Sequence, residues 1–120
     1  MEVIRAGETG FVYGGSFTGP VGLEMLLQAS TDQGPDIARV TFTDGAVTNW
    51  HRHPGGQLLY LLSGVGRVGA GSTSTASIEP GTLVRTPEDE RHWHGADAGN
   101  DAVWLAMTWG TTDWEDRSPE

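Results

Sequence analysis

The chain has 120 residues and a formal net charge of −9, with neither cysteine nor lysine, so its seven basic residues are all arginine. These absences exclude disulfides, thiolate metal sites, cysteine nucleophiles, Schiff-base chemistry and a phosphate-binding P-loop. The acidic charge disfavours nucleic acid and anionic membranes as partners. Because residues 1–5 lack the apolar core of a signal peptide and no apolar run approaches the roughly 18 residues of a membrane span, we expect a cytoplasmic protein. The arginine-only, glycine-rich composition favours a bacterial source.

Eighteen glycines and six prolines divide the chain into short segments, many of which alternate between apolar and polar residues. The segments predicted to be strands are, in chain order, 23–29, 36–42, 48–53, 57–63, 65–70, 75–78, 82–86, 91–96 and 102–109. The Ser- and Thr-rich stretch 71–77 is interpreted as a hairpin loop. We therefore predict one all-β domain over 1–120, a two-sheet jelly roll, with a flexible acidic tail at 111–120 that Trp114 can anchor.

All four histidines fall in two clusters, His51-Arg52-His53 and His92-Trp93-His94. A spacing of two residues places both rings of a pair on the same face of a strand. Gln57 follows the first pair and is expected to open a neighbouring strand of the same sheet, beside the histidines. Neutral imidazole nitrogen is a good ligand for several divalent transition metals. The sequence therefore predicts one metal ion held by these side chains.

Apolar rows on other predicted strands share the parity that faces the interior. We expect these rows to line a substrate pocket around the metal, and the residues in them are Ala38, Val40, Phe42, Leu59, Trp104, Ala106 and Thr108. For Trp104, a place in the pocket wall and ordinary core packing remain equally open.

The two histidine clusters resemble the motifs of the cupin superfamily. The first motif, G-x5-H-x-H-x3,4-E-x6-G, is matched by Gly45, His51, His53, Gln57 and Gly64, with glutamine in place of glutamate. The second, G-x5-P-x-G-x2-H-x3-N, is matched by Gly81, Pro87 and His92, with Asp89 and Ala96 as departures. This resemblance implies a cupin double-stranded β-helix, a jelly-roll barrel.

Within that superfamily, the chain is similar to small manganese-dependent hydroxynitrile lyases. The similarity includes Gln57, the stretch H-W-H-G-A at 92–96, F-T-G at 17–19 and the tail pair Trp114-Glu115. It implies His51, His53, Gln57 and His92 as metal ligands and a homodimer, and it places His94 beside the metal, either as the catalytic acid/base residue or as a structural hydrogen-bond donor. Trp104 stands where these lyases commonly have a second pocket histidine, and Thr108 stands where some relatives have glutamine. Manganese is the first choice of ion, with iron, nickel, copper and zinc as alternatives.

A neutral glutamine in place of a carboxylate leaves the metal site one negative charge short, which favours an anionic ligand. Together with the resemblance to the hydroxynitrile lyases, this implies as the leading hypothesis a metal-dependent lyase of the hydroxynitrile or aldol type, acting on a small molecule. The alternatives are a cupin dioxygenase, an isomerase or cyclase of small-molecule metabolism, and a non-catalytic, metal-dependent ligand-binding module.

Overall fold

The computed structural model describes residues 1–6, 10–12, 17–31 and 33–119. Over these residues the regular structure consists of strands, and none of it is a helix that could cross a membrane. The strands are β1 (Gly10–Val12), β2 (Val21–Leu27), β3 (Asp36–Phe42), β4 (His51–Arg52), β5 (Gln57–Gly64), β6 (Gly66–Ala70), β7 (Thr73–Ile78), β8 (Leu83–Thr86), β9 (His92–Ala96), β10 (Ala102–Thr108) and β11 (Asp113–Trp114).

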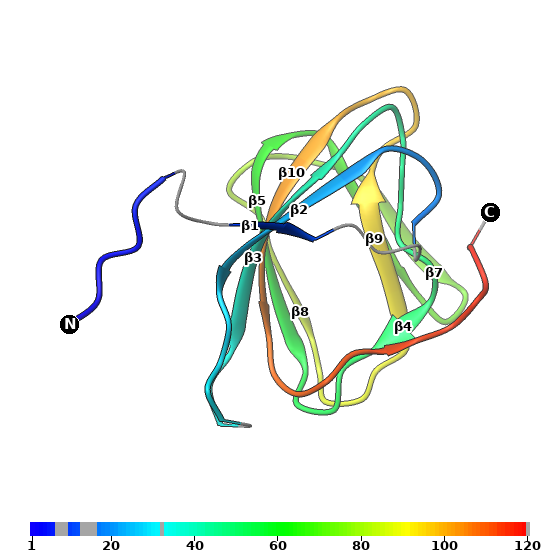
Figure 1. Cartoon of the computed structure of the whole chain (residues 1–120). Helices are drawn as coiled ribbons and strands as arrows, with labels where there is room; N and C mark the ends of the chain where they lie inside the picture. The colour runs from blue at the N-terminus through cyan, green and yellow to red at the C-terminus, as the bar shows by residue number, and fades with distance from the viewer. Residues whose placement is uncertain (7–9, 13–16, 32, 120) are drawn as a thin grey trace.

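Two antiparallel sheets face each other (Figure 1). One has the strand order β1-β2-β3-β10-β5-β8 and the other has the order β11-β4-β9-β6-β7. Inward-facing side chains alternate along β3, β5 and β10, and the largest fully buried ones include Phe42, Leu59, Leu61 and Trp104. The predicted all-β jelly roll is confirmed, with its core between the two sheets.

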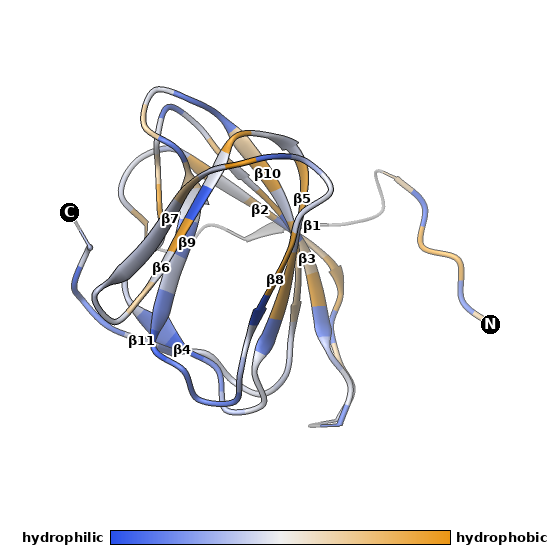
Figure 2. Ribbon diagram, turned by 180° about the vertical axis from the view of Figure 1, so that it is seen from behind, coloured by the Kyte–Doolittle hydropathy of each residue, from blue (hydrophilic) through white to orange (hydrophobic). Residues whose placement is uncertain are grey.

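Hydropathy differs between the two sheets. Apolar residues are prominent along β3, β5 and β10, whereas hydrophilic residues run through β4 and β9 (Figure 2). Because the residues of β9 are buried on both of its faces, the histidines of that strand lie inside the molecule although they are polar. A polar patch built into a protein interior indicates a functional site.

The prediction of a hairpin loop over 71–77 is wrong for most of that stretch. A turn occupies 71–72, and the chain then enters β7, which pairs with β6. Since β7 is the last strand of its sheet and its first five residues are exposed, it can consist of Thr and Ser without an apolar face. Its β-branched threonines favour the strand, whereas its polarity resembled that of a loop.

The expected position of Gln57 also needs a correction. Gln57 begins β5, which lies in the six-stranded sheet, whereas His51 and His53 come from the β4 region of the facing sheet. The turn between them includes Gly56, whose φ is 85° and whose added Cβ would lie 2.8 Å from the Thr86 carbonyl oxygen. Gln57 therefore approaches the histidines from across the sandwich.

Candidate metal centre

Three histidines from β4 and β9 bring their ring nitrogens together. His51 lies directly opposite His92 in the antiparallel pair, and His53 follows β4 by one residue. One ligand atom from each of these three side chains lies within 4.8 Å of the others. All three are at most 3% exposed, so this cluster is built into the interior.

The second ring nitrogen of each histidine is held by a group outside the cluster. His51 Nδ1 donates to the carbonyl of Asn49 at 2.8 Å, and His92 Nδ1 donates to the carbonyl of Glu90 at 3.0 Å. His53 Nδ1 lies 2.9 Å from the hydroxyl of Thr112. Because a carbonyl only accepts, the neutral rings of His51 and His92 present the lone pair of Nε2 to the cluster.

Gln57 completes the set from the facing sheet. Its Oε1 lies 3.0 Å from His92 Nε2, and its Nε2 donates to the Thr108 hydroxyl at 2.9 Å. With His92 Nδ1 donating elsewhere, the Gln57 oxygen and His92 Nε2 are two acceptors that face each other. Such a contact is favourable when a cation lies beside both atoms.

The electrostatic environment keeps these histidines neutral. Burial, assisted by the neighbouring His92, lowers the pKa of His51 to about 2, and it lowers the pKa of His53 to about 4. Burial also lowers the pKa of His92. Among the described residues, the buried Nε2 atoms of His51 and His53 have no hydrogen-bond partner. Neutral rings with unpaired, converging nitrogens fit a divalent metal ion, so the triad can hold one.

His94 lies two residues beyond His92, on the same inner face of β9. Its ring centroid is 5.5 Å from that of His51, and burial holds the pKa of His94 well below the ordinary value. Its buried Nδ1 also lacks a partner in the described part of the chain. Thr48 fixes the backbone here, since its hydroxyl accepts from His94 N–H at 3.1 Å. His94 is therefore a neutral imidazole beside the triad.

A cavity of about 110 Å³ opens on this cluster, with His51, His53, Gln57 and His94 in its wall. Of the residues expected to line a substrate pocket, Ala38, Val40 and Thr108 line this cavity. Phe42, Trp104 and Ala106 lie in the core instead, and Leu59 lies in the core and lines a second cavity on the side of His92. Trp104 is fully buried and donates from Nε1 to the Gly95 carbonyl. It is therefore a core residue and does not form part of this cavity's wall.

Sequence reasoning missed much of the cavity wall, which comes from segments distant in the chain. The missed lining residues are Phe17, Leu23, Met25, Asp36, Thr48, Thr112 and Trp114. Two of these residues, Phe17 and Trp114, belong to stretches that the family similarity had already singled out, F-T-G at 17–19 and Trp114-Glu115. Leu23 and Met25 share the inward parity of a predicted strand, and that parity was the one further signal available.

The C-terminal segment forms a strap over the metal centre. Trp114 in β11 pairs with His51 in β4, and their ring centroids are 4.4 Å apart. The strap is fixed by an ion pair between Arg91 and Glu115, and Arg91 also stacks on Trp50 at 3.8 Å. Trp114 therefore anchors this part of the acidic tail and covers one face of a candidate ligand.

Two facing antiparallel sheets that enclose a histidine triad define a metal-binding jelly roll. The chain belongs to the cupin family, since residues 38–108 match the family described as "Cupin domain". It is 39% identical over 98 residues to an (R)-mandelonitrile lyase of Granulicella tundricola, a match that covers 80% of this chain and 75% of that protein. The resemblance to the hydroxynitrile lyase-like cupins is thereby confirmed.

Solved structures agree with this assignment. A cupin-like protein from Thermotoga maritima superposes with a TM-score of 0.81 at 28% identity, covering 98% of this chain and 90% of that one. A predicted oxalate decarboxylase from the same organism gives a TM-score of 0.75 at 22% identity, covering 92% of this chain and 100% of its own. The second similarity concerns the fold alone.

Proposed function

We propose that this cupin is a metal-dependent lyase that cleaves the carbon–carbon bond of a small hydroxynitrile, or of a related aldol-type adduct. The observation that carries the proposal is the position of His94. An unpaired, buried imidazole nitrogen lies in the same cavity wall as the triad that can hold a metal. The 39% identity to a mandelonitrile lyase supports this reaction class.

In this proposal His51, His53, His92 and Gln57 hold the ion, and manganese is our first choice. When bound, a divalent ion supplies a Lewis acid that stabilises negative charge developing on a substrate oxygen. The neutral amide of Gln57 adds no negative charge to the site, and the Thr108 hydroxyl keeps the Gln57 oxygen turned inward.

His94 moves the proton. As a neutral base it accepts the hydroxyl proton of the cyanohydrin, the oxygen forms the product carbonyl, and the carbon–carbon bond breaks. Its electron pair leaves with cyanide, which takes the proton back from His94 as hydrogen cyanide. A positioned base of this kind contributes roughly 10²- to 10⁴-fold to the rate. The cavity of about 110 Å³ limits the substrate to a compact molecule.

The test is cleavage of a compact cyanohydrin, acetone cyanohydrin, followed by release of hydrogen cyanide, after loading the purified protein with Mn²⁺, Fe²⁺, Ni²⁺, Cu²⁺ or Zn²⁺ in separate samples. We expect metal-dependent turnover that is equal with and without air. His94→Ala should keep the metal and lose at least 100-fold in kcat. Turnover that needs oxygen would favour a dioxygenase. Unchanged turnover by metal-loaded His94→Ala would refute the proton-transfer role.

A further inference from the structure

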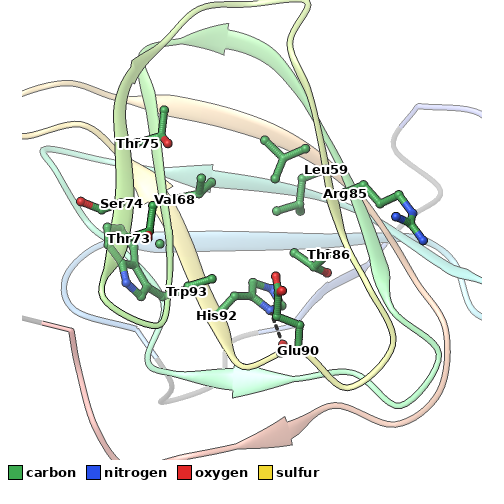
Figure 3. A pocket seen from close by; sticks show the side chains of 13 residues that line it. Leu59, Val68, Thr73, Ser74, Thr75, Arg85, Thr86, Glu90, His92 and Trp93 are labelled. Carbon is green, nitrogen blue, oxygen red and sulfur yellow. Dashed lines mark hydrogen bonds between the residues drawn. The ribbon is translucent and has the colours of Figure 1, made fainter.

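A second cavity, of about 180 Å³, has the triad residue His92 in its wall (Figure 3). It opens between β7 and β8, which are edge strands of the two facing sheets. It shares no lining residue with the first cavity among those described. The partition between the two includes His92, which lines the second cavity and whose Nε2 faces Gln57 in the wall of the first.

The walls of this cavity are mainly apolar. Leu59, Val68 and Val84 project into it from strands of both sheets (Figure 3 labels the first two). The small residues Gly69 and Ala70 of β6 also line it and leave room beside the longer apolar side chains. Gly69 cannot carry a side chain, because an added Cβ would lie 2.3 Å from the ring of Trp93 on the neighbouring strand.

The charges near the cavity disfavour an anion. Glu90 lies beside His92 at one end, and the side chain of Arg85 points away from the space (Figure 3). Cavities of about 150 Å³ with apolar walls bind a molecule such as benzene. The size, lining and charge together fit one neutral aromatic ring.

We propose that this cavity is a second ligand site, for a neutral molecule the size of one aromatic ring, and that its occupation tightens metal binding. His92 is already held by its Nδ1 bond to Glu90. A ligand in the second cavity packs against the same His92 side chain that the metal binds, so each of the two restricts the motion of that ring. Two ligands that restrict the same side chain bind with positive cooperativity. The aromatic ligand therefore tightens metal binding, and the metal tightens binding of the aromatic ligand by the same factor.

The first experiment uses toluene and metal-free protein, with amide and indole NMR shifts as the readout, so its outcome is independent of catalysis. We expect saturable shifts at Gly69, Thr86 and the Trp93 indole, and at least tenfold weaker binding of benzoate. Val84→Phe fills the cavity and should weaken toluene binding at least tenfold. Leu83→Phe is the matched control, because Leu83 precedes Val84 on β8, faces the opposite side and is 57% exposed.

Thr75→Trp, on the exposed edge strand β7, is a second filling variant in case Val84→Phe fails to fold. Toluene shifts that do not saturate, shifts centred on Thr112 and Trp114, or equal binding by both filling variants would overturn the site. The second experiment measures the Mn²⁺ affinity with and without saturating toluene. We expect at least threefold tighter Mn²⁺ binding, and an equal gain in toluene affinity on adding Mn²⁺. An unchanged Mn²⁺ affinity would overturn the coupling.

Discussion

The hydroxyl of Thr108, at the end of β10, accepts a hydrogen bond from the Gln57 amide nitrogen at 2.9 Å, so the Gln57 oxygen is turned toward His92. A side-chain amide presents either an acceptor or a donor depending on its rotation. The Thr108 hydroxyl therefore selects the orientation in which Gln57 can ligate a cation.

Removal of that hydroxyl should weaken metal binding. In Thr108→Val the amide can turn its nitrogen toward His92, and we expect about tenfold weaker Mn²⁺ binding by calorimetric titration. Thr108→Ser should restore the affinity, and Thr41→Val, on the outer face of β3, should leave it unchanged. Equal affinities for Thr108→Val and the unmodified chain would show that the hydroxyl does not orient the amide.

The strap residue Trp114 should slow the loss of metal. Its ring covers His51, which is 1% exposed, while Trp114 itself is 40% exposed. Trp114→Ala opens this side to water, and we expect transfer of the bound ion to a chelator to become about tenfold faster. Trp114→Phe retains a ring and should restore most of the protection. An unchanged transfer rate in Trp114→Ala would contradict this role.

The stability of the metal-free protein should depend on pH through its histidines. Burial lowers the pKa of His51 to about 2 and that of His53 to about 4, against 6.5 for an unperturbed ring. Below pH 6.5 the unfolded chain therefore binds protons that the folded chain does not. The free energy of unfolding is highest above that pH and falls as the pH drops, by up to about 1.4 kcal/mol per unit for each ring.

Urea unfolding at pH 7.5 and pH 5.0 tests this, since ordinary carboxylates titrate mostly below that window. The difference between the two free energies should shrink in His53→Gln, which removes one of the titrating rings. Equal stability at the two pH values in metal-free protein would contradict the neutral, buried state of the rings.

Gly95, next to His94, should tolerate no side chain. An added Cβ would lie 2.3 Å from the Ala46 carbonyl oxygen and 2.6 Å from the Val47 Cα, and backbone atoms cannot move aside cheaply. We expect Gly95→Ala to lower the free energy of unfolding by roughly 3 kcal/mol in chemical denaturation. Gly22→Ala is the control, because no atom lies within 4 Å of its added Cβ. A neutral Gly95→Ala would refute this close packing.

Several strands around the candidate metal centre could be predicted because their side chains alternate, but β4 is shorter than the predicted strand 48–53 and β11 lies in the segment predicted to be a flexible tail. The prediction 36–42 coincides with β3, and the histidine pairs share a face as their spacing indicates. The second half of the threonine-rich β7 was predicted as the strand 75–78, but its first residues could not be separated from a loop, because an exposed edge strand needs no apolar face. Gln57 lies in the facing sheet because the chain changes sheets at the turn that includes Gly56. The alternation of side chains along a strand does not indicate which sheet the next strand joins.

The outer part of the candidate site was harder to predict than the triad. Thr112 contacts His53 across 59 residues, and a single threonine in an acidic segment has no pattern that marks such a contact. The exclusion of Trp104 from the cavity wall follows from its bond to Gly95, which depends on the packing of two sheets. Local spacing thus predicts the ligands, whereas the groups that orient them come from tertiary structure.

The most direct test is the metal content of the purified protein after loading with each divalent ion and dialysis, measured together with His51→Ala and His94→Ala. We predict about one ion per chain in the unmodified protein and in His94→Ala, and a loss of the ion in His51→Ala. Failure to retain any of the five ions, or retention of the ion by His51→Ala, would contradict a metal centre built on this triad.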